Sequence, residues 1–169
     1  MSATISNVIE DTSAALLQAL ARFDEEQFNT VPFAGSWTAG QVADHLQKSV
    51  FPGVLYGPVS VADRDPEEKN AILAKIFLDF DLKMTAPDFV QPSAAPHEQA
   101  ALLNSLEQAW QQVGEAATTL DLQLLCTDSA LPQIGTLTRS EWIHFMLYHT
   151  QRHTRQLQNI YQQVNGAAA

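Results

Sequence analysis

Two histidines stand four residues apart near the end of the chain, in the stretch Tyr148-His-Thr-Gln-Arg-His-Thr-Arg-Gln-Leu157. In a helix, about 100° per residue brings His149 and His153 to one face. The predicted inward seam is apolar at its ends and polar in its middle: Trp142, Met146, His149, His153, Gln156 and Ile160. Burying polar groups without partners costs on the order of a few kcal/mol. We therefore expect a divalent metal ion to bind here, with a further ligand from elsewhere in the chain.

A third histidine stands on the apolar side of an earlier predicted helix. Thr38 and Gln41 form a capping-box pattern, which marks the start of that helix. His45 follows between Val42 and Leu46, so its ring should point inward. A lone inward histidine is more often a hydrogen-bonded core residue than a ligand, but the pair on the last helix favours ligation.

The ligand set His45, His149 and His153 has the composition of a catalytic rather than a structural zinc site. Helical bundles build metal sites from inward side chains on facing helices. Three imidazoles leave a fourth position open for water or substrate, and histidine also suits nickel. Gln156 lies one seam step beyond His153, where it could orient a ligand or a bound water. The alternative for Gln156 is an amide that hydrogen-bonds to solvent.

The helices that would position these residues follow from apolar periodicity and capping signals, which include a second capping-box pattern at Thr138 and Glu141. We expect four main helices and one short extra helix, over residues 5–23, 38–50, 97–120 and 138–164, with the extra one at 65–80. Residues 84–96 hold three prolines and should form an extended connection. Residues 131–137 should be a loop crossing the end of the bundle, and no strand pair is expected. The predicted fold class is an all-α four-helix bundle, a single domain over residues 1–169, with a long crossover between the second and third main helices that carries the short helix.

Composition narrows the classes of partner. The formal net charge is −10, from 9 Lys plus Arg against 19 Asp plus Glu, and no basic stripe stands out. We therefore expect no nucleic-acid partner. No apolar run approaches the roughly 20 residues of a membrane span, so we expect no membrane partner. The start of the sequence lacks a basic, apolar leader, so we expect a cytoplasmic location. Cys126 is the single cysteine, which excludes an internal disulfide; we expect a buried small residue there, with a nucleophile as the alternative.

Several other residues could have a functional role, but we predict a structural role for each. His144 lies on a different side of its helix from the proposed ligands and should not bind metal. His97 stands at a helix start and should be exposed, and Asp44 should be solvated rather than touch the site. Trp37 and Trp142 are more often core residues than pocket lining at such positions.

Three sequence blocks resemble the DinB-like superfamily, in particular its small bacterial branch labelled DinB-like or YfiT-like metal-dependent enzymes. The blocks are Trp37-Thr-Ala-Gly-Gln-Val-Ala-Asp-His-Leu46, Leu131-Pro-Gln-Ile-Gly-Thr-Leu-Thr-Arg-Ser-Glu-Trp142 and Tyr148-His-Thr-Gln-Arg-His-Thr-Arg-Gln-Leu157. Their order and spacing agree over essentially the whole chain. The resemblance implies the DinB-like helical bundle, a tendency to form homodimers, and metal binding by His45, His149 and His153.

The resemblance also implies a range of activities on small-molecule substrates. Characterised relatives include S-transferases that use low-molecular-weight thiols such as bacillithiol or mycothiol, and a mycothiol-dependent maleylpyruvate isomerase; others are regarded as hydrolases. A bound zinc ion can supply hydroxide for hydrolysis or hold a thiolate as nucleophile. We favour a metal-dependent enzyme, either a thiol S-transferase or a hydrolase. The alternatives are a non-catalytic metal-binding or sensing protein, and a bundle whose histidines merely hydrogen-bond to one another.

Overall fold

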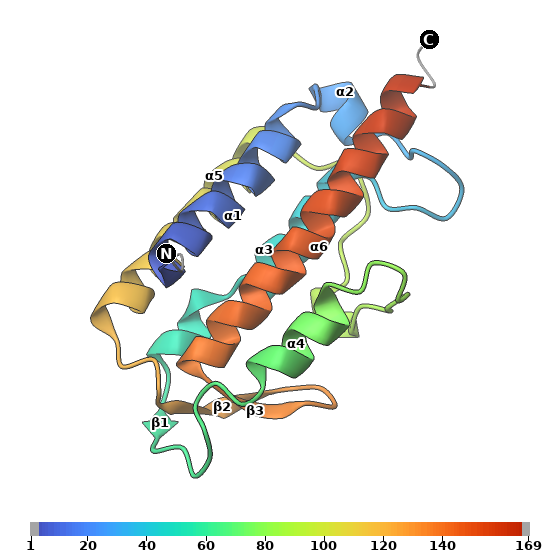
Figure 1. Ribbon diagram of the computed structural model, residues 1–169. Helices are drawn as coiled ribbons and strands as arrows, with labels where there is room; N and C mark the ends of the chain where they lie inside the picture. The colour runs from blue at the N-terminus through green and yellow to red at the C-terminus, as the bar shows by residue number, and fades with distance from the viewer. Residues whose placement is uncertain (1–3, 167–169) are drawn as a thin grey trace.

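The computed structural model describes residues 4–166, and this part of the chain is mostly helical (Figure 1). The α-helices are α1 (Ile5–Ala21), α2 (Glu25–Phe28), α3 (Ala39–Ser49), α4 (Asn70–Phe77), α5 (Gln99–Thr119) and α6 (Arg139–Gly166). Two short 3₁₀ helices are η1 (Pro52–Tyr56) and η2 (Asp88–Val90), and the strands are β1 (Val59–Ser60), β2 (Leu125–Leu131) and β3 (Gly135–Thr138). Among the helices of residues 4–166, none has both the length and the apolar character that a membrane span requires.

Capping boxes begin both helices that carry the histidines, as the sequence predicts. At the start of α3, the Thr38 hydroxyl accepts from the backbone N–H of Gln41, and the Gln41 side-chain oxygen accepts from the N–H of Thr38, both at 3.0 Å. At the start of α6, Thr138 and Glu141 make the same reciprocal pair, at 3.2 and 2.9 Å. These bonds satisfy N–H groups that a helix start otherwise leaves unpaired. They fix where each helix begins, and hence which face each histidine occupies.

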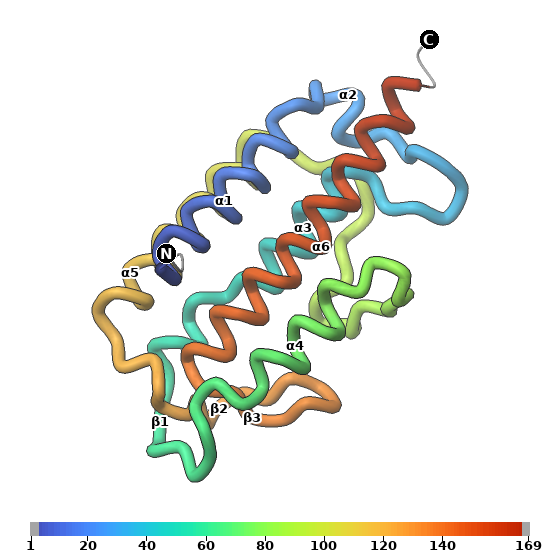
Figure 2. The backbone as a smooth tube through the Cα atoms, in the orientation of Figure 1, coloured from blue at the N-terminus to red at the C-terminus, as the bar shows by residue number. Residues whose placement is uncertain are grey.

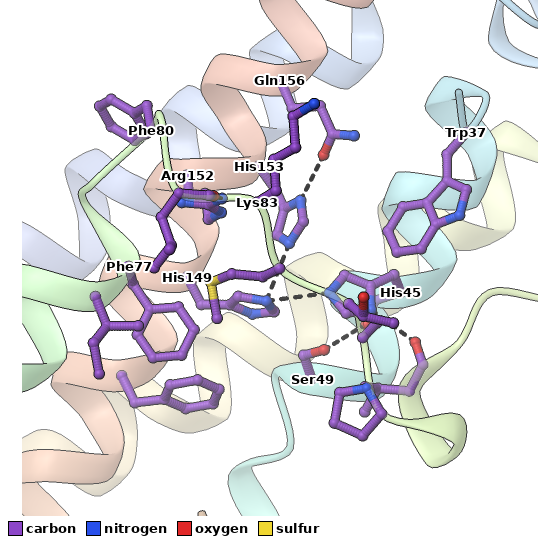
Figure 3. Close-up of a pocket in the computed structure, with 18 of the residues that line it drawn as sticks. Trp37, His45, Ser49, Phe77, Phe80, Lys83, His149, Arg152, His153 and Gln156 are labelled. Carbon is purple, nitrogen blue, oxygen red and sulfur yellow. Dashed lines mark hydrogen bonds between the residues drawn. The ribbon is translucent and has the colours of Figure 1, made fainter. Parts of the chain in front are cut away.

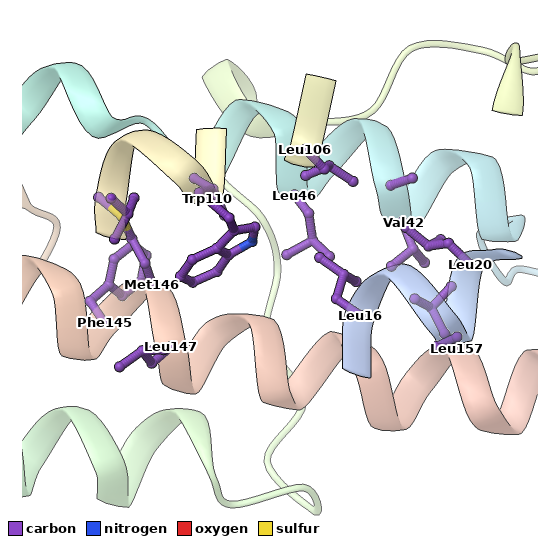
Figure 4. Packing of buried hydrophobic residues seen from close by; sticks show 14 of the residues in the cluster. Leu16, Leu20, Val42, Leu46, Leu106, Trp110, Phe145, Met146, Leu147 and Leu157 are labelled. Atoms are coloured by element: carbon purple, nitrogen blue, oxygen red, sulfur yellow. The ribbon is translucent and has the colours of Figure 1, made fainter. Parts of the chain in front are cut away.

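The four long helices pack around one apolar core. Helix α1 contacts α5 and α6, and α3 contacts the same two helices, while α4 packs on the outside of α6. Figures 1 and 2 show α1 and α6 running in one direction and α3 and α5 in the other. Each long helix contributes fully or almost fully buried side chains to the core (Figure 4), among them Leu16, Leu46, Trp110 and Leu157. Because α3 and α6 are in contact, their inward histidines can meet.

The expectation of an all-α chain without paired strands is wrong. Strand β2 pairs antiparallel with β1 on one side and β3 on the other, forming a three-stranded sheet at one end of the helices (Figure 1). The segment 131–137, expected to be a loop, contains the last residue of β2, a tight turn over residues 132–134 and most of β3. Gln133 and Gly135 have positive φ values of 67° and 94°, which the turn requires. The backbone N–H of Arg139 donates to the carbonyl of Leu124 at 2.9 Å, so the sheet is tied to the start of α6.

The short helix of the crossover is shorter than predicted. It covers Asn70–Phe77 rather than residues 65–80, and residues 65–69 form a turn instead. The Asp65 side chain accepts from the N–H of Glu67 at 2.9 Å, and the N–H of Lys69 donates to Glu141 at 2.8 Å. Because the N–H of Lys69 donates to Glu141 rather than to the carbonyl of Asp65, the regular helix begins only after Lys69.

A fully buried carboxylate connects the crossover to α6. The two oxygens of Glu141 accept from the two terminal guanidinium nitrogens of Arg64, at 2.7 and 2.8 Å. They also accept from the backbone N–H groups of Lys69 and Thr138. Although burial alone raises the pKa of the Glu141 carboxyl, the bonds from Arg64 and from the two N–H groups outweigh burial and lower that pKa. The carboxylate therefore stays ionised and anchors the crossover beside the helix that carries His149 and His153.

Candidate metal centre

Three histidine side chains from α3 and α6 converge on one point (Figure 3). His45 lies near the middle of α3, and His149 and His153 lie on successive turns of α6; all three are buried, with exposed fractions of 3%, 8% and 9%. The Nε2 atom of His149 lies 3.1 Å from Nε2 of His45 and 3.1 Å from Nε2 of His153. Two imidazole nitrogens bound to one tetrahedral zinc ion lie about 3.3 Å apart. Two of the three Nε2 pairs therefore have close to the spacing of a metal site, and the ligand atoms of all three histidines lie within 4.8 Å of one another.

The outer ring nitrogens decide which atoms of His45 and His153 face this point as acceptors. Nδ1 of His45 lies 2.7 Å from the carbonyl oxygen of Val90, and Nδ1 of His153 lies 2.7 Å from the side-chain oxygen of Gln156. Those oxygens only accept hydrogen bonds, so each Nδ1 must carry the proton and donate it. The Nε2 atoms of both rings therefore present lone pairs, as metal ligands must.

His149 cannot complete the hydrogen bonding of this cluster by itself. A single proton on its Nε2 can pair with only one of the two facing lone pairs, and its Nδ1 has no hydrogen-bond partner within residues 4–166. A proton on Nδ1 instead would leave three lone pairs facing one another. A divalent cation satisfies all three lone pairs at once. The donor set therefore fits a metal ion better than it fits a cluster in which the histidines only satisfy one another.

The local electrostatics keep the three rings neutral at pH 7. Burial lowers the pKa of His149 well below its usual value, and His153 and His45 add to this effect. Burial, with a contribution from His45, lowers the pKa of His153 to about 3, against the opposing effect of the Gln156 hydrogen bond. Burial also lowers the pKa of His45, although its bond to Val90 raises it. Neutral imidazoles have the lone pair that a metal needs, so the cluster is ready to bind at neutral pH.

Aromatic rings form the walls around the histidines. The Phe145 ring stacks on His149 with centroids 5.3 Å apart, and the Phe77 ring meets His149 edge-on at 5.6 Å. On the other side, Trp37 lies 5.1 Å from the His45 ring and 6.4 Å from that of His153. These contacts limit the rotation of the imidazoles and reduce the access of water to them. They therefore help to fix the three imidazoles in their positions.

The cluster lines an open cleft of about 1560 Å³, which is large enough for a small-molecule ligand. One wall is α6. The opposite wall is formed largely by residues 78–91, here called the cleft segment, which follow α4 and include η2. The guanidinium of Arg152 donates to the carbonyl oxygens of Asp79, at 2.6 Å, and Leu82, and so ties the cleft segment to α6. Trp37 and Trp142 both line the cleft, and Trp142 also packs in the core.

Gln156, which the sequence suggested as a residue that orients a ligand, contacts His153 as described above. His144 lies apart from the cluster, as predicted, and its Nδ1 lies 2.8 Å from the backbone carbonyl oxygen of Ser140. The expectation of an exposed His97 is wrong: 8% of its side chain is exposed, and its Nε2 lies 2.9 Å from the Ser93 hydroxyl. Cys126 is buried, and burial raises the pKa of its thiol, so it is a packing residue rather than a nucleophile.

Asp44 is not solvated, contrary to the expectation, because it anchors the connection to α5. Its carboxylate accepts from Lys48 and from the backbone N–H of Ser93, each at 2.8 Å. Burial raises the pKa of this carboxyl, but these two bonds outweigh burial and lower it. Lys48 also donates to the carbonyl of Gln91 at 2.9 Å, one residue after the carbonyl of Val90 that His45 contacts. Asp44 thus acts on His45 through the backbone rather than by direct contact.

Two parts of the site have little or no sequence signal. The carbonyl of Val90 is a backbone group, and nothing in the Pro-rich connection marks it as the partner of His45. The cationic lining is the second part: Arg152 and Arg155 stand in the histidine motif, but only the fold brings Lys83 to the same cleft. A search for cations at helical spacing from the ligands could have found the two arginines.

Comparisons with known proteins found a matching family model and a distant relative. The family model described as the DinB superfamily matches residues 9–157, a range that includes all three histidines and Gln156. The chain is similar to an uncharacterized protein, YuaE, from Bacillus subtilis (strain 168). The two are 24% identical over 148 residues, which cover 88% of this chain and 91% of the relative. No solved structure gives a significant match.

Proposed function

Since the chain belongs to the DinB superfamily, and since three neutral imidazoles converge beside an open cleft, we propose that the protein is a metal-dependent enzyme acting on a small molecule. The observation that carries the proposal is the convergence of three Nε2 atoms, two of them held as acceptors by the partners of their Nδ1 protons. The proposed ligands are His45, His149 and His153. Zinc or nickel suits an all-imidazole set best.

The chain supplies binding and orientation at this site. Val90 and Gln156 fix two of the rings, and the aromatic walls keep water from the ligands. When bound, a divalent metal lowers the pKa of a thiol or of water, which makes a nucleophile available at neutral pH. The cleft then holds the second reactant beside the ligand cluster.

The first candidate reaction is S-transfer from a low-molecular-weight thiol to a small electrophile. In this reaction the sulfur forms a bond to carbon, the leaving group departs with the electrons of its broken bond, and the thiol proton passes to solvent. The supporting observation is that, within residues 4–166, no carboxylate lines the cleft. Metal-assisted hydrolysis commonly uses a carboxylate as general base, so hydrolysis is the second candidate.

Metal content is the first test. Protein purified without an affinity tag or chelator should contain about one zinc or nickel ion per chain by elemental analysis, and His149→Ala should lose it. The matched control is His144→Ala, a histidine of the same helix outside the cluster, which should keep the metal. Equal metal content in wild type and His149→Ala would overturn the ligand assignment.

Activity is the second test. Metal-loaded protein would be incubated with 1-chloro-2,4-dinitrobenzene and each of bacillithiol, mycothiol and glutathione, with chloride release measured against His149→Ala. Ester and amide substrates would be screened in parallel for hydrolysis. Thiol-dependent turnover supports S-transfer. Stoichiometric metal without either activity would favour the alternative of a non-catalytic metal-binding or sensing protein.

The family resemblance also leads us to propose a homodimer. Light scattering on the purified protein should give twice the chain mass of 18.6 kDa. A monomer at every concentration up to about 1 mM would contradict this.

A further inference from the structure

The charge of the cleft is opposite to that of the chain as a whole. The chain carries a formal net charge of −10, yet within residues 4–166 every Asp, Glu, Lys or Arg that lines the cleft is a cation: Lys83, Arg152 and Arg155. The three acids of the cleft segment, at positions 79, 81 and 88, are exposed and are not among the lining residues. A low-dielectric cleft lined by one sign of charge concentrates ligands of the other sign.

Two of these cations are held in place by the fold. Arg152 stands on α6 between His149 and His153, and its guanidinium is fixed by the backbone carbonyls of the cleft segment. The guanidinium of Arg155 lies 4.6 Å from the centre of the Phe80 ring. Backbone carbonyls and an aromatic ring do not neutralise a positive charge, so both charges still act on a ligand in the cleft.

Lys83 is the cation that remains available. Its side chain is exposed, and within residues 4–166 it makes no ion pair or side-chain hydrogen bond. In Figure 3 its side chain lies on the same side of the histidine cluster as Arg152 and Gln156. An anionic group that entered the cleft could therefore pair with Lys83 without breaking an existing contact.

The rim of the same cleft is apolar. Six large hydrophobic residues line the cleft and are exposed by 41–71%: Phe33, Ile72, Phe80, Leu82, Met84 and Phe89. Four of them belong to the cleft segment, Ile72 lies on α4, and Phe33 stands on the loop before α3. Such a concentration of exposed apolar side chains around one opening is typical of a ligand-binding groove.

We infer that the substrate is an amphipathic organic anion, with its acid group beside Lys83 and Arg152 and its apolar body against the rim. The inference deepens the proposed function by naming its substrate class, and it rests on that function for the reaction. Binding of the anion itself depends only on the cleft and requires no metal.

A matched pair of fluorescent probes separates charge from apolar contact. The probes are 1-anilinonaphthalene-8-sulfonate and N-phenyl-1-naphthylamine, which share the same rings and differ by the sulfonate. Chelator-treated, metal-free protein should bind the sulfonate at least about tenfold more tightly than the neutral amine. Raising the salt concentration should weaken only the sulfonate, because salt screens exposed charges.

The variant Lys83→Glu should weaken sulfonate binding by about five- to tenfold and leave the neutral probe unchanged. Lys75→Glu is the control, an exposed lysine of α4 that does not line the cleft. Circular dichroism of each variant checks that helix content is retained, since the sulfonate probe also binds loosely packed proteins.

Equal affinity for the two probes, or an equal loss in both lysine variants, would overturn the inference. Sulfonate binding that appears only after metal loading would also overturn it, because the metal rather than the cations would then hold the anion. The proposed function fails in a different way: if no metal binds but the metal-free cleft still prefers the sulfonate, the anion site stands without the metal enzyme.

Discussion

Replacing Gln156 by leucine should weaken metal binding by about 10- to 100-fold. The Gln156 oxygen accepts the Nδ1 proton of His153 at 2.7 Å and thereby leaves Nε2 free for the metal. Leucine has a similar size but cannot accept this proton. A buried N–H without a partner costs about 1–3 kcal/mol, and each 1.4 kcal/mol is a factor of ten in affinity.

The loss should appear in metal binding because the Gln156 oxygen fixes which nitrogen of His153 presents its lone pair. In the metal-free variant, the proton of His153 can sit on either nitrogen: on Nε2 it can donate to Nε2 of His149, 3.1 Å away, and the proton of His149 then lies on its unpartnered Nδ1. A metal on Nε2 of His153 removes this choice and holds the proton on Nδ1, where leucine offers no acceptor. Gln156→Glu keeps an acceptor oxygen and should therefore bind at least as tightly as the wild type.

The assay is a competitive zinc titration against a chromogenic chelator of known affinity, with circular dichroism to verify folding. Gln163→Leu is the matched control, because Gln163 is exposed on the same helix and lies away from the cleft. Wild-type affinity in Gln156→Leu would refute the reasoning from the tautomer of His153. So would an equal loss in Gln163→Leu.

Four further predictions test the site and the fold. His153→Ala should lose tight metal binding, and its melting temperature should no longer rise when metal is added. In the wild type, metal at a hundredfold excess over Kd should stabilise the fold by about 2.7 kcal/mol. The far-UV circular dichroism spectrum of the variant should stay helical. Glu141→Gln should destabilise the fold by about 3 kcal/mol at pH 7 in urea melts, because the partly buried guanidinium of Arg64, whose side chain is 19% exposed, loses its bidentate carboxylate partner. The pKa of Glu141 is lowered in the folded state, so the stability that its ionised form contributes is present above the unfolded pKa and is lost as pH falls through the folded pKa. The difference in unfolding free energy between wild type and Glu141→Gln should therefore shrink below about pH 4.5. A constant difference down to pH 3 would contradict this. We predict no salt-dependent DNA affinity in a fluorescence anisotropy titration, since the acidic balance gives no basic stripe. We also propose that residues 1–169 fold as one domain, so calorimetric unfolding should show a single transition.

Short-range sequence patterns predicted most of the helices and the candidate metal ligands. Capping boxes at Thr38 and Thr138 are short-range patterns, and the structure contains both reciprocal pairs. The convergence of His45 with the pair on α6 followed from apolar spacing on two helices that had to face each other. Patterns of this kind depend on neighbours a few residues apart, which is why they can be read directly.

The missed features depend on long-range pairing or on the backbone. The sheet joins Val59 to Cys126, and β2 holds the polar run Thr127, Asp128 and Ser129, which lacks the alternation of a half-buried strand. The carbonyl of Val90 has no residue type to recognise. The buried role of Asp44 depends on Ser93, 49 positions away in the chain.

The attachment of the cleft segment determines which of its side chains can be substituted without loss of the fold. Arg152, His45 and Lys48 hold this segment through the backbone oxygens of residues 79, 82, 90 and 91, while among its side chains Phe80 contacts Arg155 and Val90 is buried. Backbone oxygens are common to all residue types, so side chains between the anchors can be exchanged without loosening the attachment. The residues that select the small molecule can thus be changed separately from those that bind the metal. A library randomised at Leu82, Met84 and Phe89 should yield folded, metal-binding proteins that differ mainly in which small molecules they bind.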